Sequence, residues 1–268
     1  MRVADLTTSR ELLWNLTLRE LRSKYKRSVL GWTWSMLNPL ATMLIYTFVF
    51  GVVLRTKPQA AMANGGHVFA FFLLCALLPW NFFSMTSTMS MSALLANAGL
   101  VKKVWFPREI LIFANVGSLL VSFAIEMALL SVALVIAGNM VIVWLPLVIL
   151  LMLLLAVLAT GFGLLLAALN VYFRDLGYLW GIIVQLWFFA TPIVYPPELV
   201  QKRIGGLVLR LYEANPMAVF GRCFRDVMYE LRWPTAFQLG YLTVVSVAVL
   251  AFGLWVFNRL SVRFAEEL

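Results

Sequence analysis

The chain has 268 residues, of which 63% are hydrophobic and 12% charged, and its formal net charge is +9. Its mean hydropathy is +0.92. Soluble domains contain about 45–50% apolar and about 25% charged residues. This composition therefore excludes an ordinary soluble domain and indicates an α-helical membrane protein.

Residues 1–32 form the first predicted unit, a cytoplasmic amphipathic helix at the membrane interface. Thr8 followed by Glu11 is typical of a capping box, which would start the helix there. Basic residues separate apolar side chains that recur at helical spacing, namely Trp14, Leu18, Leu21, Tyr25 and Val29. Such a helix lies on the membrane with its basic groups against anionic head groups. The alternative is a basic anchor that only sets topology.

Residues 33–268 form the second predicted unit, a domain with six transmembrane helices. A helix needs roughly 20 predominantly apolar residues to cross the hydrocarbon core, and several charge-free runs are that long. The long run 127–173 should hold two helices, divided at Ala137-Gly138-Asn139 or just before Trp144-Leu145-Pro146. The predicted fold class is an all-α membrane protein with spans near residues 33–54, 68–95, 110–137, 145–169, 176–195 and 239–258.

The basic residues predict the orientation, because Lys and Arg near the ends of spans favour the cytoplasmic side. The predicted cytoplasmic segments hold 13 of the 21 Lys and Arg residues, whereas Arg55, Lys57 and six more in residues 196–238 lie on the predicted outer side. Six spans then place both termini in the cytoplasm. The predicted location is the bacterial cytoplasmic, or inner, membrane.

Residues 96–109 form a short basic segment on the predicted cytoplasmic side. An aromatic pair, Trp105 and Phe106, follows Lys102 and Lys103 and is expected to be exposed. Aromatic side chains beside basic ones are frequent in protein contact surfaces. A generic loop is the alternative.

Residues 196–238 form the longest segment between predicted spans and lie on the predicted outer side. Asn215-Pro216 is a typical helix start, and an apolar face follows at Met217, Phe220, Phe224, Val227 and Leu231. Trp233-Pro234 is expected to end this helix, and an earlier short helix is expected over residues 198–212. We interpret the segment as short gate helices, or alternatively as an interfacial anchor.

Residues and motifs that commonly carry catalysis or bind metals and nucleotides are scarce in this chain. The chain has one histidine, His67, and no Gly-rich phosphate loop ending in Gly-Lys-Ser/Thr. We therefore expect no catalytic residue, no metal site and no cofactor in this chain. Glu126 is the one ionisable residue inside a predicted span, and we expect it to face the protein or water because its charge is costly against lipid. A proton-coupled carrier could use it.

Aromatic residues make up 14% of the chain and are dense in the first and fifth predicted spans. Aromatic rings at span ends commonly form an interfacial belt. Rings deeper in a span, such as Trp187, could instead stack against the C–H faces of sugars. Packing is the simpler interpretation of any single ring.

Taken in order, these segments resemble the membrane subunit of type-2 ABC exporters of polysaccharide, the family of O-antigen, capsule, teichoic-acid and cell-wall-galactan permeases. The resemblance covers nearly the whole chain. It is carried by residues 21–34 with Leu37-Asn38-Pro39-Leu40, the loop from Asn97 to Arg108, Tyr172-Phe173-Arg174-Asp175, Thr191-Pro192-Ile193-Val194-Tyr195-Pro196 and Asn215-Pro216.

The resemblance implies a homodimer docked on two copies of a separate nucleotide-binding ATPase, which would hold ATP and Mg. It implies a polyprenyl-pyrophosphate-linked polysaccharide as cargo, membrane lipids as surroundings and no nucleic acid. The loop after the second span would couple to the ATPase through Asn97, Lys102, Lys103, Trp105 and Phe106. The lipid head would meet Arg22, Lys24, Lys26 and Arg27, because phosphate oxygens accept charge-assisted hydrogen bonds.

The first and fifth spans would line the translocation path, by resemblance. The path residues would be Trp34, Tyr46, Trp180, Trp187, Phe188, Phe189 and Tyr195. The outer gate would include Asn215, Pro216, Phe220 and Phe224. Other hypotheses stay open: an ABC permease for a drug or lipid, a proton-coupled carrier and a membrane-embedded enzyme acting on polyprenyl-linked sugars.

Overall fold

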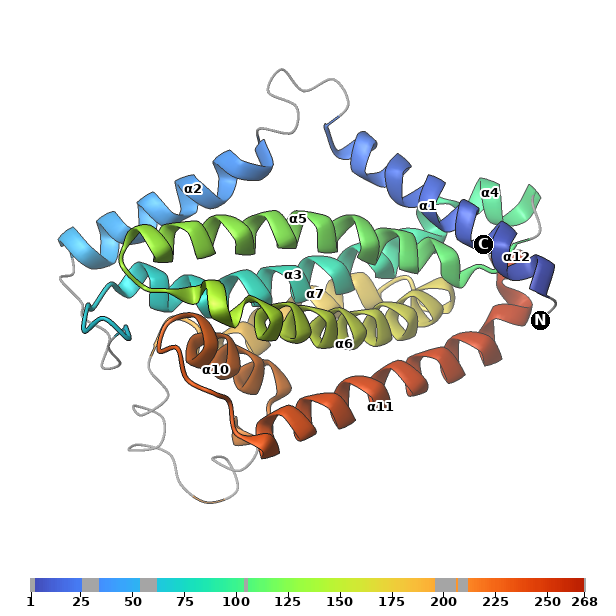
Figure 1. Cartoon of the computed structure of the whole chain (residues 1–268). Coiled ribbons are helices and arrows are strands. Elements are labelled where there is room, and N and C mark those ends of the chain that lie inside the picture. Colours follow the sequence, from blue (N-terminus) through green and yellow to red (C-terminus); the bar gives the residue numbers. More distant parts are fainter. Residues whose placement is uncertain are drawn as a thin grey trace.

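A computed structural model describes residues 3–25, 34–53, 62–103, 106–195, 206 and 212–267. Every regular element among these residues is a helix (Figure 1). This confirms the all-α fold class. The capping-box prediction is wrong, because α1 (Val3–Tyr25) already includes Thr8 and Glu11 inside the helix.

Among the described residues, four segments are long and apolar enough to cross a membrane. They are α3 (Phe69–Ala96), α5 (Glu109–Ile136), α6 (Leu145–Tyr172) with the preceding turn η3 (Val141–Trp144), and α11 (Ala236–Leu260). Two further predicted spans are shorter apolar helices. They correspond to α2 (Trp34–Tyr46) with its π-helical continuation η2 (Thr47–Val53), and to α7 (Leu176–Phe189).

The boundary between the third and fourth predicted spans has both expected turn signals. α5 ends at Ile136, and Gly138 follows with a φ of +85°, a conformation that glycine adopts without strain. α6 then begins at Leu145 with Pro146 in its first turn, where the missing N–H of proline leaves no helical bond unmade. The predicted break in this long apolar run is therefore confirmed.

α3 and α6 form the centre of the bundle, with α5 and α11 packed on either side. α6 and α11 meet at two glycines. A Cβ added to Gly253 would lie 2.3 Å from the Gly161 carbonyl oxygen, so no side chain fits between the two backbones. Small residues permit this close approach of membrane helices. Gly161 and Gly253 thus bring the backbones of α6 and α11 into direct contact within one chain.

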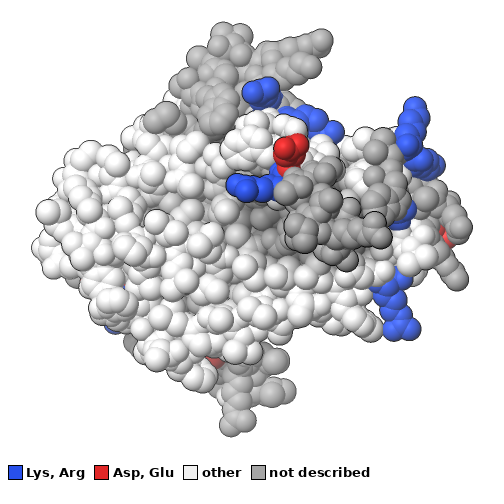
Figure 2. Space-filling view, turned by 45° about the vertical axis from the view of Figure 1, so that its right-hand side comes forward, with Lys and Arg blue, Asp and Glu red and all other residues white. Residues whose placement is uncertain are grey.

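The first and last described helices lie at the same end of the molecule (Figure 1). This end holds α1, α4 (Ala98–Lys103) and the terminal pair η4 (Ser261–Arg263) and α12 (Phe264–Glu267). Figure 2 shows Lys and Arg gathered over this part of the visible face, while the described surface to their left is white. We call it the basic end. The opposite end holds α10 (Pro216–Met228), and we call it the α10 end.

Candidate functional site

The aromatic residues of α7 do not all face the same way. Trp180 is 5% exposed and donates from Nε1 to the Ser87 hydroxyl at 3.3 Å. Trp187 and Phe188 are half-buried and lie 6.2 and 5.7 Å from the Trp80 ring. These rings attach α7 to α3, so three of the predicted path residues lie on the side of α7 that packs inside the chain.

The aromatic cluster on α3 and α6 against which α7 packs was not predicted from the sequence. Phe83 lies 5.2 Å from Trp187, and Phe162 of α6 lies 5.6 Å from Trp187 and 5.9 Å from Trp180, measured between ring centroids. Edge-to-face pairs of this kind add about 0.5–1.5 kcal/mol each beyond burial. A single sequence gives no signal for the cluster, since its members come from three separate helices.

The opposite face of α7 is open in the single chain. Tyr178 is 82% and Phe189 62% exposed, Gln185 between them is exposed, and a Cβ at Gly181 would meet nothing within 4 Å. Of the predicted path residues, only Phe189 belongs to this face. We call Tyr178, Gly181, Gln185 and Phe189 the open face of α7.

The remaining predicted path residues lie elsewhere. Tyr46 ends α2 and is half-buried, and Tyr195 is half-buried beyond α7, where its hydroxyl donates to the Phe189 carbonyl at 2.6 Å. Trp34 begins α2, and its side chain lies outside the described set. The structure therefore does not bring the seven predicted path residues together on one surface.

α1 packs along α5. Leu16 and Leu21 are buried, and the Thr17 side chain lies against Gly117 of α5, within 3.4 Å of where a Cβ would stand. Trp14 is 64% exposed and points away from this contact. A cavity of about 730 Å³ opens beside it, lined by Arg10, Glu11, Leu13, Trp14 and Thr17.

The predicted lipid-head residues are only partly described. Arg22 is exposed near the end of α1. Lys24 lies in the helix without a described side-chain position, and Lys26 and Arg27 lie outside the described residues.

The predicted coupling loop forms an elbow at the basic end. Asn97 ends α3, and its amide nitrogen donates to the Ala93 carbonyl at 2.9 Å. Its amide oxygen accepts a hydrogen bond from Arg19 of α1, also at 2.9 Å. Lys102 and Lys103 are exposed at the end of α4. The elbow therefore presents two cations and contacts α1 directly.

The expectation of an exposed Trp–Phe pair is wrong for Phe106, which is 9% exposed and belongs to the hydrophobic core. It anchors the return from α4 into α5. Trp105 lies outside the described residues. Next in the chain, Arg108 donates to the Ser261 carbonyl, and Tyr172 donates to the Leu260 carbonyl at 2.9 Å. These two contacts fix the C-terminal end of α11 to α5 and α6.

At the α10 end, the predicted helix start is confirmed. Asn215 caps α10 by accepting from the Met217 amide at 3.0 Å, and Pro216 is the first helical residue. The predicted apolar face is buried at Met217, Phe220, Phe224 and Val227. The helix ends at Met228, earlier than predicted, and Leu231 lies beyond it with a φ of 52°. The predicted helix over 198–212 lies almost wholly outside the described residues.

The other faces of α10 are buried too, which the amphipathic pattern did not indicate. Arg225 is 3% and Asp226 4% exposed. Asp226 accepts two hydrogen bonds from Arg232, at 2.9 and 2.6 Å. Burial raises the pKa of the Asp226 carboxyl above its ordinary value, and the hydrogen bond from Arg232 opposes this rise. A charged pair flanked by apolar residues was the sequence signal that could have indicated a buried polar contact.

Arg225 binds the end of α7. Its Nη1 and Nη2 donate to the carbonyls of Pro192 and Ile193, each at 2.7 Å, and its Nε donates to the Phe72 carbonyl of α3 at 3.1 Å. Its guanidinium carbon also lies 3.8 Å from the centre of the Phe72 ring.

Asn215 binds the same segment. Its Nδ2 donates to the Ala190 carbonyl at 3.2 Å and the Thr191 hydroxyl at 3.0 Å, and its Oδ1 accepts from Trp187 Nε1 at 2.9 Å. We call Asn215, Arg225 and their partners in residues 187–193 the α10 polar cluster.

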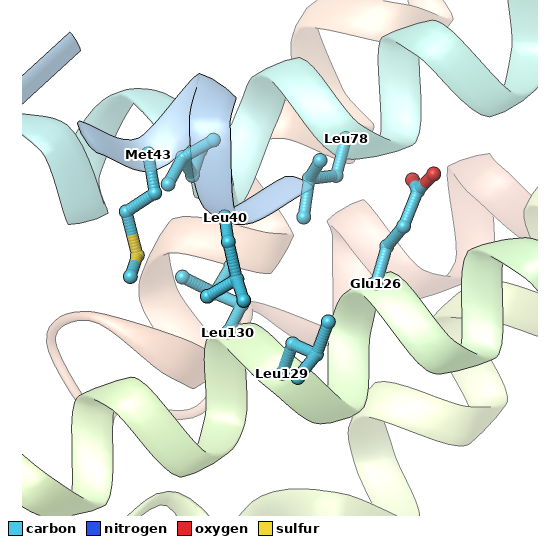
Figure 3. Close-up of a pocket in the computed structure, with 7 residues that line it drawn as sticks. Leu40, Met43, Leu78, Glu126, Leu129 and Leu130 are labelled. Atoms are coloured by element: carbon cyan, nitrogen blue, oxygen red, sulfur yellow. The ribbon is translucent and has the colours of Figure 1, made fainter. Parts of the chain in front are cut away.

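Glu126 lies on the side of α5 that faces α2 and α3, as expected for a charge that avoids lipid. It borders a cavity with Leu40, Met43, Leu74, Leu78, Leu129 and Leu130. Figure 3 shows its carboxylate to one side of the apolar side chains that line most of this cavity. The cavity volume is about 20 Å³, room for about one water molecule. Its size excludes a cargo site within this cavity.

Within the part of the chain that the structure describes, no three or more His, Cys, Asp or Glu side chains form a group that could hold a metal ion. The described residues form apolar helices of membrane-spanning length, one end rich in Lys and Arg, and polar contacts that join helices to one another. These features define the class of multi-pass helical membrane proteins.

The chain belongs to the membrane family of ABC-2 type transporters, whose sequence profile matches residues 11–229. It is 35% identical over 267 residues to the O-antigen export system permease protein RfbA of Myxococcus xanthus, covering 99% of this chain and 98% of that protein. A protein of the same name from Klebsiella pneumoniae is 29% identical over 267 residues, covering 96% and 95%. The polysialic acid transport protein KpsM of Escherichia coli is 38% identical over 86 residues, 32% of this chain and 31% of KpsM.

Proposed function

We propose that the chain is the transmembrane subunit of an ATP-driven exporter that moves lipid-linked polysaccharide across the bacterial cytoplasmic membrane. The observation that carries this proposal is the similarity to an O-antigen export permease over 99% of the chain. The sequence has no phosphate-binding loop of its own, so a separate ATPase would supply the energy. Two copies of the chain and two of the ATPase would form the transporter, with the basic end and both termini in the cytoplasm.

The open face of α7 supports a path between two copies of the chain. Gln185 carries an amide in the middle of an otherwise apolar helix, and hydrocarbon offers its donors and acceptor no partner. Sugar hydroxyls would satisfy this amide, while Tyr178 and Phe189, about 16 Å apart along the helix axis, would stack on sugar rings. Tyr178, Gln185 and Phe189 therefore fit the glycan better than the inward-facing Trp180 and Trp187.

The basic end supports docking of the ATPase. α4 presents Lys102 and Lys103 beside the Arg19–Asn97 hydrogen bond, so a push on the elbow would reach both α3 and α1. ATP binding in the partner would move α4, and the movement would pass along α3 into the bundle. Phe106 would transmit this force from the core without touching the partner.

α1 supports a role for the lipid head group. Arg22 is exposed, Trp14 faces away from the bundle, and the cavity beside Trp14 has the volume of an ordinary small-molecule site. A pyrophosphate head would bind Arg22 together with Lys24, Lys26 and Arg27. The isoprenoid chain would stay in the membrane beside Trp14.

Reconstitution tests the proposed function. Proteoliposomes would contain the chain alone, its co-purifying ATPase alone, or both, together with a polyprenyl-pyrophosphate glycan that a glycosidase outside the vesicle can digest. We expect ATP-dependent protection of the glycan only with both proteins. Transport by the chain alone, or transport of a fluorescent phospholipid with the glycan left digestible, would contradict the proposal.

A further inference from the structure

α7 ends in a way that exposes backbone acceptors. The helix stops at Phe189, and residues 190–195 are irregular. The last carbonyls of a helix have no partner within the helix, and Pro192 cannot donate a hydrogen bond onward. The carbonyls of Ala190, Pro192 and Ile193 therefore need partners from elsewhere.

α10 supplies those partners at two points. Asn215 binds the Ala190 carbonyl, and Arg225 binds the carbonyls of Pro192 and Ile193. The two side chains are ten residues apart, about 15 Å along α10. A contact at two separated points resists both translation and rotation of one segment against the other.

α10 is itself part of the core. Phe220 and Phe224 are fully buried, a Cβ at Gly221 would lie 3.3 Å from that of Ala76 in α3, and Arg225 also binds the Phe72 carbonyl. The contacts of Arg225 are buried and therefore costly to break, because each group would lose its partner without gaining water, whereas the Asn215–Ala190 hydrogen bond is exposed. The outer end of α7 is thus fixed to α3 through α10.

The inner end of α7 is held by apolar packing, in which Trp180 lies in a small cluster with Met91 and Leu166, and by the hydrogen bond from Trp180 to Ser87. Trp180 is its one fully buried residue, while Tyr178, Ile182 and Leu186 are all more than half exposed. α7 therefore has one end fixed by polar contacts and a body fixed mainly by rings on one face.

We infer that the α10 polar cluster is the pivot of α7: during transport the outer end of α7 and α10 stay fixed to α3, and the inner end of α7 swings. This inference rests on the proposed function, and it assigns Asn215 and Arg225 as positioning residues. α10 then acts as a fixed support and does not open as an independent lid.

Spin-label distances in the complete transporter with its ATPase test the pivot without requiring any cargo. One pair joins Arg222→Cys on α10 to Phe189→Cys at the outer end of α7. The second pair joins Arg222→Cys to Tyr178→Cys at the inner end. The native thiols of Cys75 and Cys223 are buried and unpaired with each other, and they would be replaced by alanine and serine as a precaution.

On addition of ATP with a hydrolysis-blocked ATPase, we expect the inner distance to change by several ångströms and the outer distance to stay constant. An outer distance that changes as much as the inner one would overturn the pivot, as would two constant distances. In Arg225→Lys, a single ammonium cannot reach three carbonyls, so the outer distance should begin to change with nucleotide. Arg222→Lys, on the same helix, is the matched control, with labels placed at Phe189 and at the exposed Glu213 just before α10.

Cross-linking gives a functional readout. A disulfide between Ala76→Cys and Gly221→Cys, whose Cβ separation is close to the usual range of about 3.5–4.5 Å, should leave at least half of the export rate. A thiol cross-link between Met91→Cys and Gly177→Cys, at the inner end of α7, should lower export at least ten-fold. A tenfold loss of export with the first cross-link, reversed by reductant, would establish α10 as a moving lid. Failure of that disulfide to form would contradict the packing of α10 against α3 on which the pivot depends. If the two cysteine variants export no glycan even before cross-linking, the proposed function fails. The spin-label distances still test the pivot in that case.

Discussion

The two ends of the bundle place their polar side chains in opposite ways. At the α10 end, Asn215 and Arg225 are turned inward, and their hydrogen bonds go to backbone carbonyls of the same chain. At the basic end, Lys102 and Lys103 are exposed and point away from the bundle. The first arrangement joins helices to one another, and the second leaves charge available to another protein. Changes at the α10 end should therefore affect stability, and changes at the basic end should affect association.

The largest effect should come from Arg225→Met. It leaves three buried carbonyls without their charged donor, and hydrogen bonds to charged groups are worth about 1.5–3 kcal/mol each. We expect a loss of about 3–5 kcal/mol in the free energy of unfolding, measured by denaturation in detergent. Arg222→Met, on the same helix but half-buried, should cost less than about 1 kcal/mol. Equal losses for the two variants would mean that the buried hydrogen bonds of Arg225 contribute no more to stability than the half-buried Arg222.

Charge reversal at the basic end should give the second largest effect. Lys102→Glu with Lys103→Glu should weaken binding of the ATPase at least ten-fold, about 1.4 kcal/mol, because like charges across an interface repel. Stability of the isolated chain should change by less than about 0.5 kcal/mol. Co-purification and stimulated ATP hydrolysis measure the first quantity. Arg174→Glu, exposed in the turn before α7, is the control and should bind normally.

The pH dependence of the α10 end should be smaller. Because burial raises the pKa of Asp226, the folded chain takes up a proton at a higher pH than the unfolded chain. The contribution of Asp226 to stability should therefore rise as the pH falls through the raised pKa toward the ordinary range of aspartate. Asp226→Asn keeps an acceptor for Arg232 and should flatten this dependence. If the stability of the wild type relative to Asp226→Asn instead fell as the pH was lowered, the raised pKa of Asp226 would be contradicted.

The smallest effect should come from the Arg19–Asn97 hydrogen bond, which is exposed and shared with Glu20. A double-mutant cycle with Arg19→Gln and Asn97→Ala should give a coupling energy of about 0.2–1 kcal/mol for stability. If the bond transmits movement, stimulated ATP hydrolysis should show a larger coupling than stability does. A coupling of zero in both measurements would mean that α1 and the elbow act independently.

The positions of the four long apolar helices were predictable because the thickness of the membrane sets the minimum length of a span. Helix ends with local signals, such as Gly138 and Asn215-Pro216, were predictable as well. The buried face of α7 was not. Its residues are nearly all apolar, so no polar stripe distinguishes its sides, and the inward position of Trp180 depends on Ser87, far away in the sequence.

The structure revises two interpretations for physical reasons. Phe106 was expected to be exposed because it follows two lysines, but the short α4 returns it to the core. The amphipathic pattern of α10 did not indicate that its polar face is buried as well. Arg225 binds carbonyls of residues distant in the sequence, and Asp226 binds Arg232. Periodicity cannot distinguish a polar face that meets water from one that meets other parts of the protein.

The placement of α1 and α12 at one end of the molecule has a practical consequence. If all six predicted spans cross the membrane, reporter proteins fused to the N-terminus and to the C-terminus would share a compartment. A fluorescent protein and a periplasmic phosphatase, attached in turn at each terminus, would therefore give matching signals, and a mismatch would mean that one apolar segment lies along the bilayer surface.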